Sequence, residues 1–193
     1  MKHLLLILSL VGCGKGSGSS GSKNLMDSEL VGTWKSACID IDEMSFQAIR
    51  IFTDNTQKII GTAYGANKCE SPVYYTYETV TGFTIIDMDI SPHKINYITQ
   101  SVTYTPYAPE WVEYINKESY FGYATWESEK SKSVVDRAQT PADEPEPSVG
   151  DMRYGVYNIK DGYFIPGNTD TLDGKSEEKR PIIVDETKKC KKE

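Results

Sequence analysis

Apolar and polar residues alternate in short runs along most of the chain, and the two-residue period of this alternation is that of a β-strand. Turn residues separate the runs, and Asp161-Gly162 is the strongest hairpin signal among them. A second hairpin is expected across Thr81-Gly82. The expected strands are one that begins near Gly32 and those at residues 44–53, 57–64, 73–80, 83–90, 94–105, 120–126, 152–160, 163–165 and 182–184.

Two stretches depart from the strand pattern. In residues 110–116, three apolar side chains fall at i, i+3 and i+4, which predicts a short amphipathic helix with Pro109 near its first turn. Residues 141–147 read Pro-Ala-Asp-Glu-Pro-Glu-Pro. Because proline has no N–H to give to a neighbouring strand, this stretch is expected to be a long, exposed acidic loop.

Most of the expected strands are neighbours in sequence, so they are expected to pair antiparallel. Closing them into an up-and-down barrel of about eight strands would remove the exposed edges of such a sheet. Composition agrees, because aromatic residues make up 11% of the chain and 13 of them are tyrosines, which favour strands. The sequence therefore predicts an all-β domain with one short helix, and 193 residues suit one such domain.

The first 26 residues have the composition of a targeting segment followed by a linker. Residues 4–11 are apolar but far too short to span a bilayer, which needs roughly 20 apolar residues, and they match the apolar part of a secretory signal. Residues 14–22 are mostly Gly and Ser and suit a flexible tether. The predicted organisation is a signal peptide at 1–12, a linker at 13–26, a folded domain at 27–187 and a basic tail at 188–193.

Leu10-Val11-Gly12-Cys13 resembles the lipobox of bacterial lipoproteins. The resemblance implies cleavage before Cys13 and attachment of fatty acyl chains, such as palmitate, to that cysteine. Gly14 after it, rather than Asp, implies an outer-membrane location in the bacterial cell envelope. The alternative is an ordinary secretory signal with an incidental cysteine. The net charge of −7, without a basic face, argues against nucleic acid as a partner.

Three cysteines remain if Cys13 is acylated. A Cys38–Cys69 disulfide is favoured because it would join the first strand to the end of the third, and it would contribute about 3–4 kcal/mol. Cys190 lies among four lysines, which should favour its thiolate and its reactivity. The alternative is that Cys190 pairs with one of the other two. No cysteine spacing matches a metal site, and no metal or other cofactor is predicted.

Gly32-x-Trp34, which opens the series of strands, resembles the start of lipocalins and the wider calycin group. In that group the tryptophan plugs one end of an eight-stranded barrel, and the other end admits a small apolar ligand. The resemblance implies the same plug role for Gly32 and Trp34. The helix before Tyr120 and the long acidic loop depart from that family.

A second resemblance covers most of the chain after the tether. Its segments are 30–38, 69–72, 122–126, 173–174 and 180–181, and together they resemble uncharacterised bacterial envelope lipoproteins. The Trp–Cys…Cys-x-x-Pro arrangement within them is similar to extracellular domains of an animal membrane family that antagonises Wnt signalling. Those domains imply a lipocalin-like barrel with a cavity that accepts lipid.

Several side chains are candidates to contact such a ligand. Tyr75 and Tyr77 point to one side of their strand, where they would line a cavity, belong to a packed core or form a ladder that faces solvent. Arg50 interrupts an apolar run, so it either faces solvent or is a buried cation that awaits a carboxylate such as a fatty-acid head group. Arg180 is a candidate to stack on Trp34. The expected ligand-binding residues are Arg50, Tyr64, Tyr75, Tyr77 and Trp126.

No catalytic motif accompanies these residues, so no enzymatic activity is predicted. The leading hypothesis is an envelope lipoprotein that is anchored to the membrane by lipid and binds a small hydrophobic or amphiphilic ligand in its barrel. The alternative is a structural or protein-interaction module with a filled barrel and no ligand. In that case the acidic loop and the helix would face a protein partner.

Overall fold

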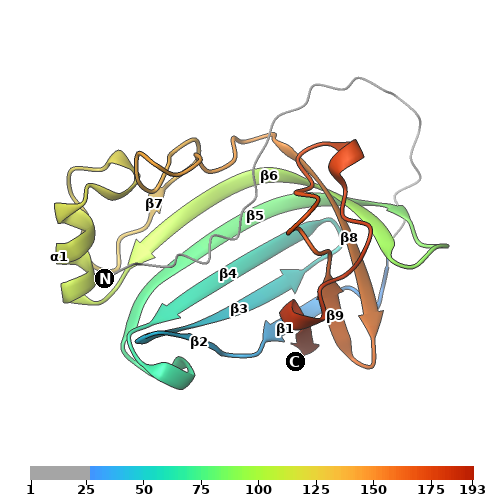
Figure 1. Ribbon diagram of the computed structural model, residues 1–193, viewed down its shortest axis with the longest axis horizontal. Helices are drawn as coiled ribbons and strands as arrows, with labels where there is room; N and C mark the ends of the chain where they lie inside the picture. Colours follow the sequence, from blue (N-terminus) through green and yellow to red (C-terminus); the bar gives the residue numbers. More distant parts are fainter. Residues whose placement is uncertain (1–26) are drawn as a thin grey trace.

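The computed structural model describes residues 27–193, which form a closed antiparallel barrel (Figure 1). The strands that form the barrel are β1 Gly32–Ser36, β3 Met44–Phe52, β4 Thr56–Tyr64, β5 Val73–Asp87, β6 His93–Pro106, β8 Met152–Lys160, β9 Tyr163–Pro166 and β10 Cys190–Lys192. They pair in the order β1-β10-β9-β8-β6-β5-β4-β3, and pairing of β3 with β1 closes the ring of eight strands. The predicted all-β barrel is confirmed.

Two short strands and one helix lie outside this ring. Strand β2 (Ile39–Ile41) pairs with β3, and β7 (Lys132–Ser133) pairs with β6. The helix α1 spans Pro109–Lys117 and confirms the predicted helix, with proline in its first turn. Short 3₁₀ turns cover Asn67–Cys69, Tyr120–Gly122, Glu177–Lys179 and Glu186–Lys188.

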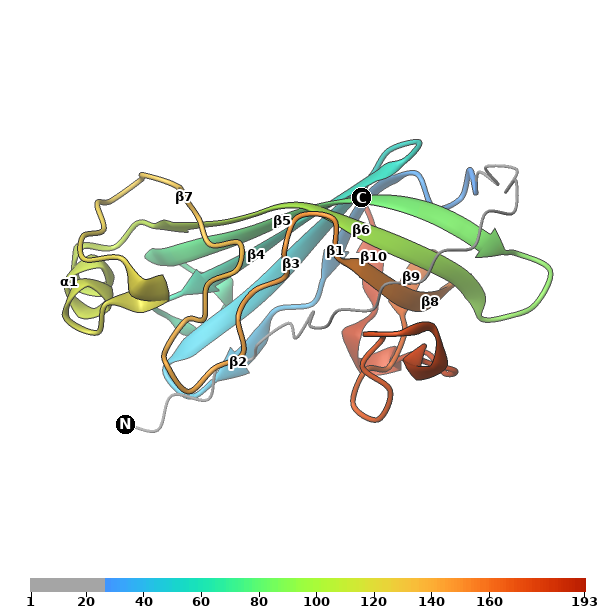
Figure 2. The same cartoon turned by 90° about the horizontal axis from the view of Figure 1, so that it is seen from above.

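The wall of the barrel is made differently at its two ends. Strand β6 pairs with β8 only from His93 to Ile98. Farther along, β6 pairs with β7, the Val134 amide donates to Val102 at 3.0 Å, and the Gly150 amide donates to Thr99 at 2.8 Å. The segment from α1 to β8 therefore closes the wall where β8 and β9 do not reach. Figures 1 and 2 show α1 at one end of the long axis and β8 and β9 toward the other.

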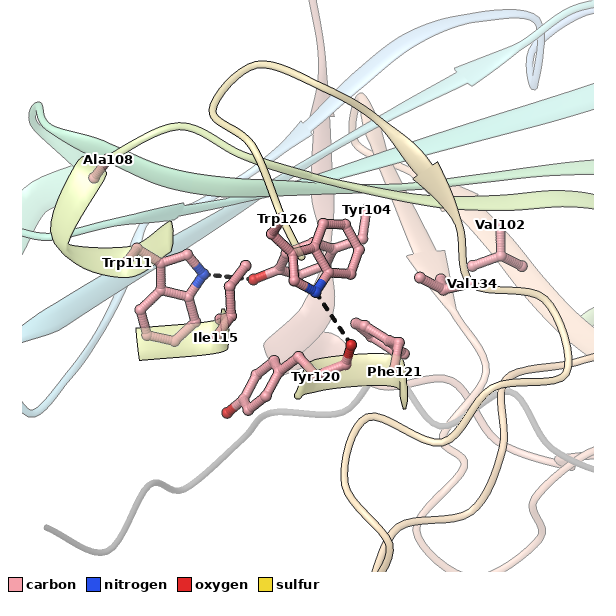
Figure 3. Close-up of a cluster of buried hydrophobic side chains, with 9 residues drawn as sticks. All are labelled: Val102, Tyr104, Ala108, Trp111, Ile115, Tyr120, Phe121, Trp126 and Val134. Atoms are coloured by element: carbon pink, nitrogen blue, oxygen red, sulfur yellow. Dashed lines mark hydrogen bonds between the residues drawn. The ribbon is translucent and has the colours of Figure 1, made fainter. Parts of the chain in front are cut away.

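Two groups of buried apolar side chains fill the ends of the barrel. The group near β8–β10 is called the base cluster, and its buried members are Leu30, Trp34, Phe52, Ile85, Ile95, Tyr157, Phe164 and Cys190. The group beneath α1 is called the cap cluster (Figure 3), and its buried members are Val102, Tyr104, Ala108, Trp111, Ile115, Tyr120, Phe121, Trp126 and Val134. Both ends of the barrel are thus closed by side chains.

The hairpin expected across Thr81-Gly82 is wrong, because β5 runs through both residues. Gly82 pairs with Thr56 on one side and with Ile98 on the other, and Thr81 points inward and is buried. Pairing on both sides outweighs the turn preference of a single glycine. The chain turns instead at residues 88–92. The hairpin at Asp161-Gly162 is confirmed, and both residues have the positive φ of a two-residue turn, 53° and 76°.

The strand expected at residues 120–126 is also wrong. The chain forms a 3₁₀ turn there, with φ of 55° at Phe121, and the aromatic side chains enter the cap cluster from a loop. Residues 182–184 form no strand, and Ile182 is 72% exposed.

Two further predictions differ from the structure, one at the C-terminal end of the domain and one in the acidic loop. The predicted basic tail contains β10, which pairs with β1 and β9, so the domain continues to Lys192 rather than ending at residue 187. The acidic loop is only partly exposed, because Pro147 is buried and Glu146 is partly buried. The predicted signal peptide, Cys13 and the tether lie outside the described residues.

Candidate functional site: the barrel lumen

The disulfide between Cys38 and Cys69 is present, as predicted. It ties the chain beside β2 to the turn after β4. The Cys69 amide also donates to Ser45 Oγ at 2.8 Å, and the Lys68 amide donates to Asp40 at 2.7 Å. Cys190 is a free, buried cysteine, so the alternative pairing is wrong.

Trp34 lies in the base cluster and is 1% exposed. Its indole N–H donates to the Leu30 carbonyl at 2.8 Å, and its ring lies 6.0 Å from the Phe164 ring. Gly32 has a φ of 134°, which favours glycine, and a Cβ there would lie 2.9 Å from Lys192 Cε. This placement suits the plug role implied for Gly32 and Trp34.

The cation over the Trp34 ring is the Lys192 ammonium at 4.9 Å, so the expected stacking of Arg180 is wrong. Arg180 instead donates to the carbonyls of Ile95 at 3.0 Å and Gly155 at 2.9 Å. These bonds hold the segment after β9 against β6 and β8.

The cap cluster fills the end of the barrel that the lipocalin resemblance leaves open for a ligand. The Trp111 indole N–H donates to the Tyr104 hydroxyl at 2.6 Å, and the Tyr75 ring stacks 4.8 Å from that of Tyr104. The Trp126 indole N–H donates to the Tyr120 carbonyl at 3.1 Å, as Figure 3 shows. Tyr75 and Trp126, both expected at the ligand, therefore belong to a packed aromatic core at this end.

A polar layer separates the two apolar ends. Gln57 on β4, Thr81 on β5 and Thr99 on β6 pair side by side on the inner face, and all three are buried. Among the described residues, Gln57 Nε2 and Thr81 Oγ1 have no hydrogen-bond partner. Buried polar atoms normally find a partner, so this layer has unused capacity to bind a polar group.

Arg50 reaches into the lumen beside this layer. It alternates with the buried, inward Phe52 along β3 and pairs with Trp34 on β1. Its guanidinium carbon lies 5.7 Å from the centre of the Phe164 ring, and its Nε is buried without a hydrogen bond. None of the ion pairs formed within residues 27–193 includes Arg50. The lumen therefore holds a cation that no carboxylate neutralises.

The charge of Arg50 acts on two neighbours from different strands. Burial raises the pKa of Tyr97 on β6 to about 12, and the Arg50 charge opposes that rise. Burial also raises the pKa of the Cys190 thiol on β10, although the adjacent Arg50 lowers it. The burial of Cys190 in the base cluster, with its Sγ donating to the Lys188 carbonyl at 3.6 Å, therefore works against the thiolate that its lysine neighbours were predicted to favour.

A second guanidinium enters the lumen from β8. Arg153 is 3% exposed and pairs with Tyr97. Its charge acts on Glu146, which accepts a hydrogen bond from the Tyr77 hydroxyl. Burial raises the pKa of Glu146, while the Tyr77 bond and Arg153 lower it. The lumen thus brings the guanidinium groups of Arg50 and Arg153 and the carboxylate of Glu146 to its inner face.

The structure brings together only part of the expected site. Arg50 and Tyr77 both face the lumen, and their role in ligand binding stays a prediction. Tyr64 follows the inward Ala63, so the alternation turns it to the outer face. The sequence analysis missed Arg153 and Glu146. The one signal that could have identified them is a charged residue within an otherwise apolar or proline-rich stretch.

Comparison with known proteins assigns no family. No family model matches the chain, and no curated protein matches it significantly. In the part of the chain that the structure describes, no helix has both the length and the apolar character needed to cross a membrane. Nor does any group of three or more His, Cys, Asp or Glu side chains within residues 27–193 suit a metal ion.

Proposed function

We propose that this protein is a lipid-anchored lipoprotein of the bacterial envelope, placed in the outer membrane, and that it binds a small amphiphile with an anionic group inside its barrel. The anchor rests on the lipobox-like segment that ends at Cys13. The ligand class rests on the lumen, where Arg50 supplies the observation that supports it most. The proposed role is binding, without catalysis.

The cost of burying a charge argues for an anionic ligand. A guanidinium removed from water without a paired anion is unfavourable by several kcal/mol unless an opposite charge offsets it. Arg50 forms no ion pair with a carboxylate among residues 27–193, and its Nε has no acceptor. A carboxylate or similar group of a ligand would supply both.

The surroundings of Arg50 suit an amphiphile rather than a free ion. Ala48 on β3 and Gly61 on β4 pair with each other on the inner face next to Tyr77, and they add almost no side-chain volume to the lumen. Both residues are partly accessible rather than sealed in a core. An acyl chain would lie against this inner face with its anionic end toward Arg50.

The test is recovery of the ligand from the purified protein. Lipid extraction and native mass spectrometry of the full-length protein, isolated from bacterial membranes, should reveal a bound anionic amphiphile. Arg50→Met should remove it, whereas Lys58→Met, which breaks an exposed ion pair with Glu78 on the outer wall, should retain it. An empty wild-type barrel, or equal recovery from Arg50→Met, would refute the proposal.

A second candidate function follows from the filled ends of the barrel. The cap cluster leaves no open mouth beneath α1, which favours a structural or protein-interaction module. Deletion of residues 141–147 would then abolish capture of a protein partner. Under the ligand hypothesis, the same deletion would leave Arg50 and Arg153 in place, so ligand binding would persist.

A further inference from the structure

The acidic loop is built as a unit that is closed on itself. We call residues 137–147 the lid. The Glu146 amide donates to the Arg137 carbonyl at 3.0 Å, the Asp143 amide donates to the Thr140 carbonyl at 3.0 Å, and Ala138 bridges to Pro145. Because these bonds lie within the lid, it can shift without breaking them.

Few contacts tie the far part of the lid to the barrel. Glu144 pairs with Lys175 at 2.8 Å, but its side chain is 64% exposed, so this pair contributes little. The Glu146 carboxylate, in contrast, enters the lumen and accepts the hydrogen bond of Tyr77, which lies 69 residues away along the chain. Glu146 is therefore the side chain that holds the far part of the lid against the lumen. The base of the lid is fixed separately, because the Phe121 amide donates to the Gln139 carbonyl at 3.0 Å and Arg137 donates to the Phe121 carbonyl at 2.9 Å.

Burial in the lumen disfavours the ionised form of the Glu146 carboxylate. Burial raises the pKa of this carboxyl, and neither the Tyr77 bond nor Arg153 restores it to its ordinary value. An ionised Glu146 would be better solvated outside. A groove of about 390 Å³ lies at the base of the lid, between Phe121 and Gly122 on one side and lid residues 137–141 on the other.

We propose that Tyr77 and Arg153 form an anion-binding site in the lumen, that Glu146 occupies this site when no ligand is present, and that the carboxylate of a fatty acid displaces it. This inference rests on the proposed function, because it concerns the ligand of the same lumen. A fatty acid fits because the group to be replaced is itself a carboxylate. A ligand carboxylate between Arg153 and Arg50 would interact with two cations. Glu146 is stabilised by the charge of Arg153 alone.

The experiment compares Glu146→Ala with a matched variant two residues earlier in the lid. Glu144→Ala removes the same charge from the exposed side. Both are made in the full-length chain carrying Cys13→Ser, in which position 13 cannot be acylated. Decanoate, decyl phosphate and decanol are titrated into each protein by calorimetry, and circular dichroism confirms the fold.

Glu146→Ala should bind decanoate about tenfold more tightly than the parent protein, because decanoate no longer has to displace the Glu146 carboxylate from the site. Glu144→Ala should match the parent, and decanol affinity should not change. Glu146→Gln, which keeps the Tyr77 bond without the charge, serves if the alanine variant fails to fold and should also gain affinity.

The outcomes separate this inference from the proposed function. If the parent binds decanoate and both Glu146 variants bind it with the same affinity as the parent, the lid does not compete with the ligand and the inference is overturned. A gain for decyl phosphate alone overturns the assignment to carboxylates. If no protein binds any of the three compounds, the proposed function itself fails, and the inference fails with it.

Discussion

Removal of the Cys38–Cys69 disulfide gives the most quantitative prediction. The bond closes a loop with a sequence separation of 31 residues. The chain-entropy relation for a loop of this length gives about 12 cal/mol/K, or about 3.7 kcal/mol at 25 °C. The double variant Cys38→Ser/Cys69→Ser should lose this amount from its free energy of unfolding.

The loss should arise mainly in the unfolded state. The loop keeps its other anchors, because the Cys69 amide still donates to Ser45 and the Lys68 amide to Asp40. The native barrel should therefore persist. An unfolding entropy of about 2.1 cal/mol/K per residue over residues 27–193 gives about 350 cal/mol/K, so Tm should fall by about 10 °C.

The assay is urea and thermal denaturation followed by circular dichroism. Reductant should shift the wild type toward the double variant and leave the double variant unchanged. Cys190→Ser is the control and should respond to reductant as the wild type does, because Cys190 forms no disulfide. A loss below about 1 kcal/mol would refute the reasoning that this loop gains its stability from the crosslink.

Three further predictions concern the lumen. Arg50→Met should raise the free energy of unfolding of the ligand-free protein by about 1–2 kcal/mol in urea, because an unpaired, partly buried charge is removed; destabilisation would contradict this. Cys190 should resist thiol reagents in the native protein and react only on unfolding, and fast native labelling would contradict its burial. Because burial raises the Glu146 pKa, its contribution to stability is full below the pKa of an unfolded Glu, about 4.3, and is lost as pH rises through the higher folded pKa. Glu146→Gln should remove this fall, as pH-dependent unfolding curves would show; parallel curves for the two proteins would contradict it.

The strands, the helix and the disulfide were predictable because their signals are local. Trp111 and Ile115 lie four residues apart and both are buried by α1, as their spacing predicts. Over the nine residues of β4, the buried residues Gln57, Ile59 and Ala63 likewise fall on the inward positions of a two-residue period. A signal of that length survives the competing preferences of single residues.

β10 could not be predicted, because it depends on distant partners. It has only three residues, and the exposed lysines after Cys190 resemble a solvated tail. Its pairing with β1 joins residues more than 150 positions apart. Thr81-Gly82 shows the opposite error, since a local turn signal yields to pairing on both sides of β5.

The candidate site was predictable only in part for the same reason. Arg50 stands out in the sequence because it interrupts an apolar run, and it does face the lumen. Glu146 lies in a proline-rich stretch typical of a solvated loop, and only tertiary structure brings it to Tyr77. The inward direction of Arg153 follows only from its pairing with Tyr97 in the barrel.

We propose that Arg50 binds the anionic group of a ligand inside the barrel. NMR of the Arg50 Nε–H resonance during a decanoate titration tests it most directly, because this donor has no acceptor in the ligand-free protein. Binding should produce a saturable shift of that resonance, while Arg180, which already donates to the Ile95 and Gly155 carbonyls and lies outside the lid, stays unchanged. An unchanged Arg50 signal at saturating decanoate would contradict it.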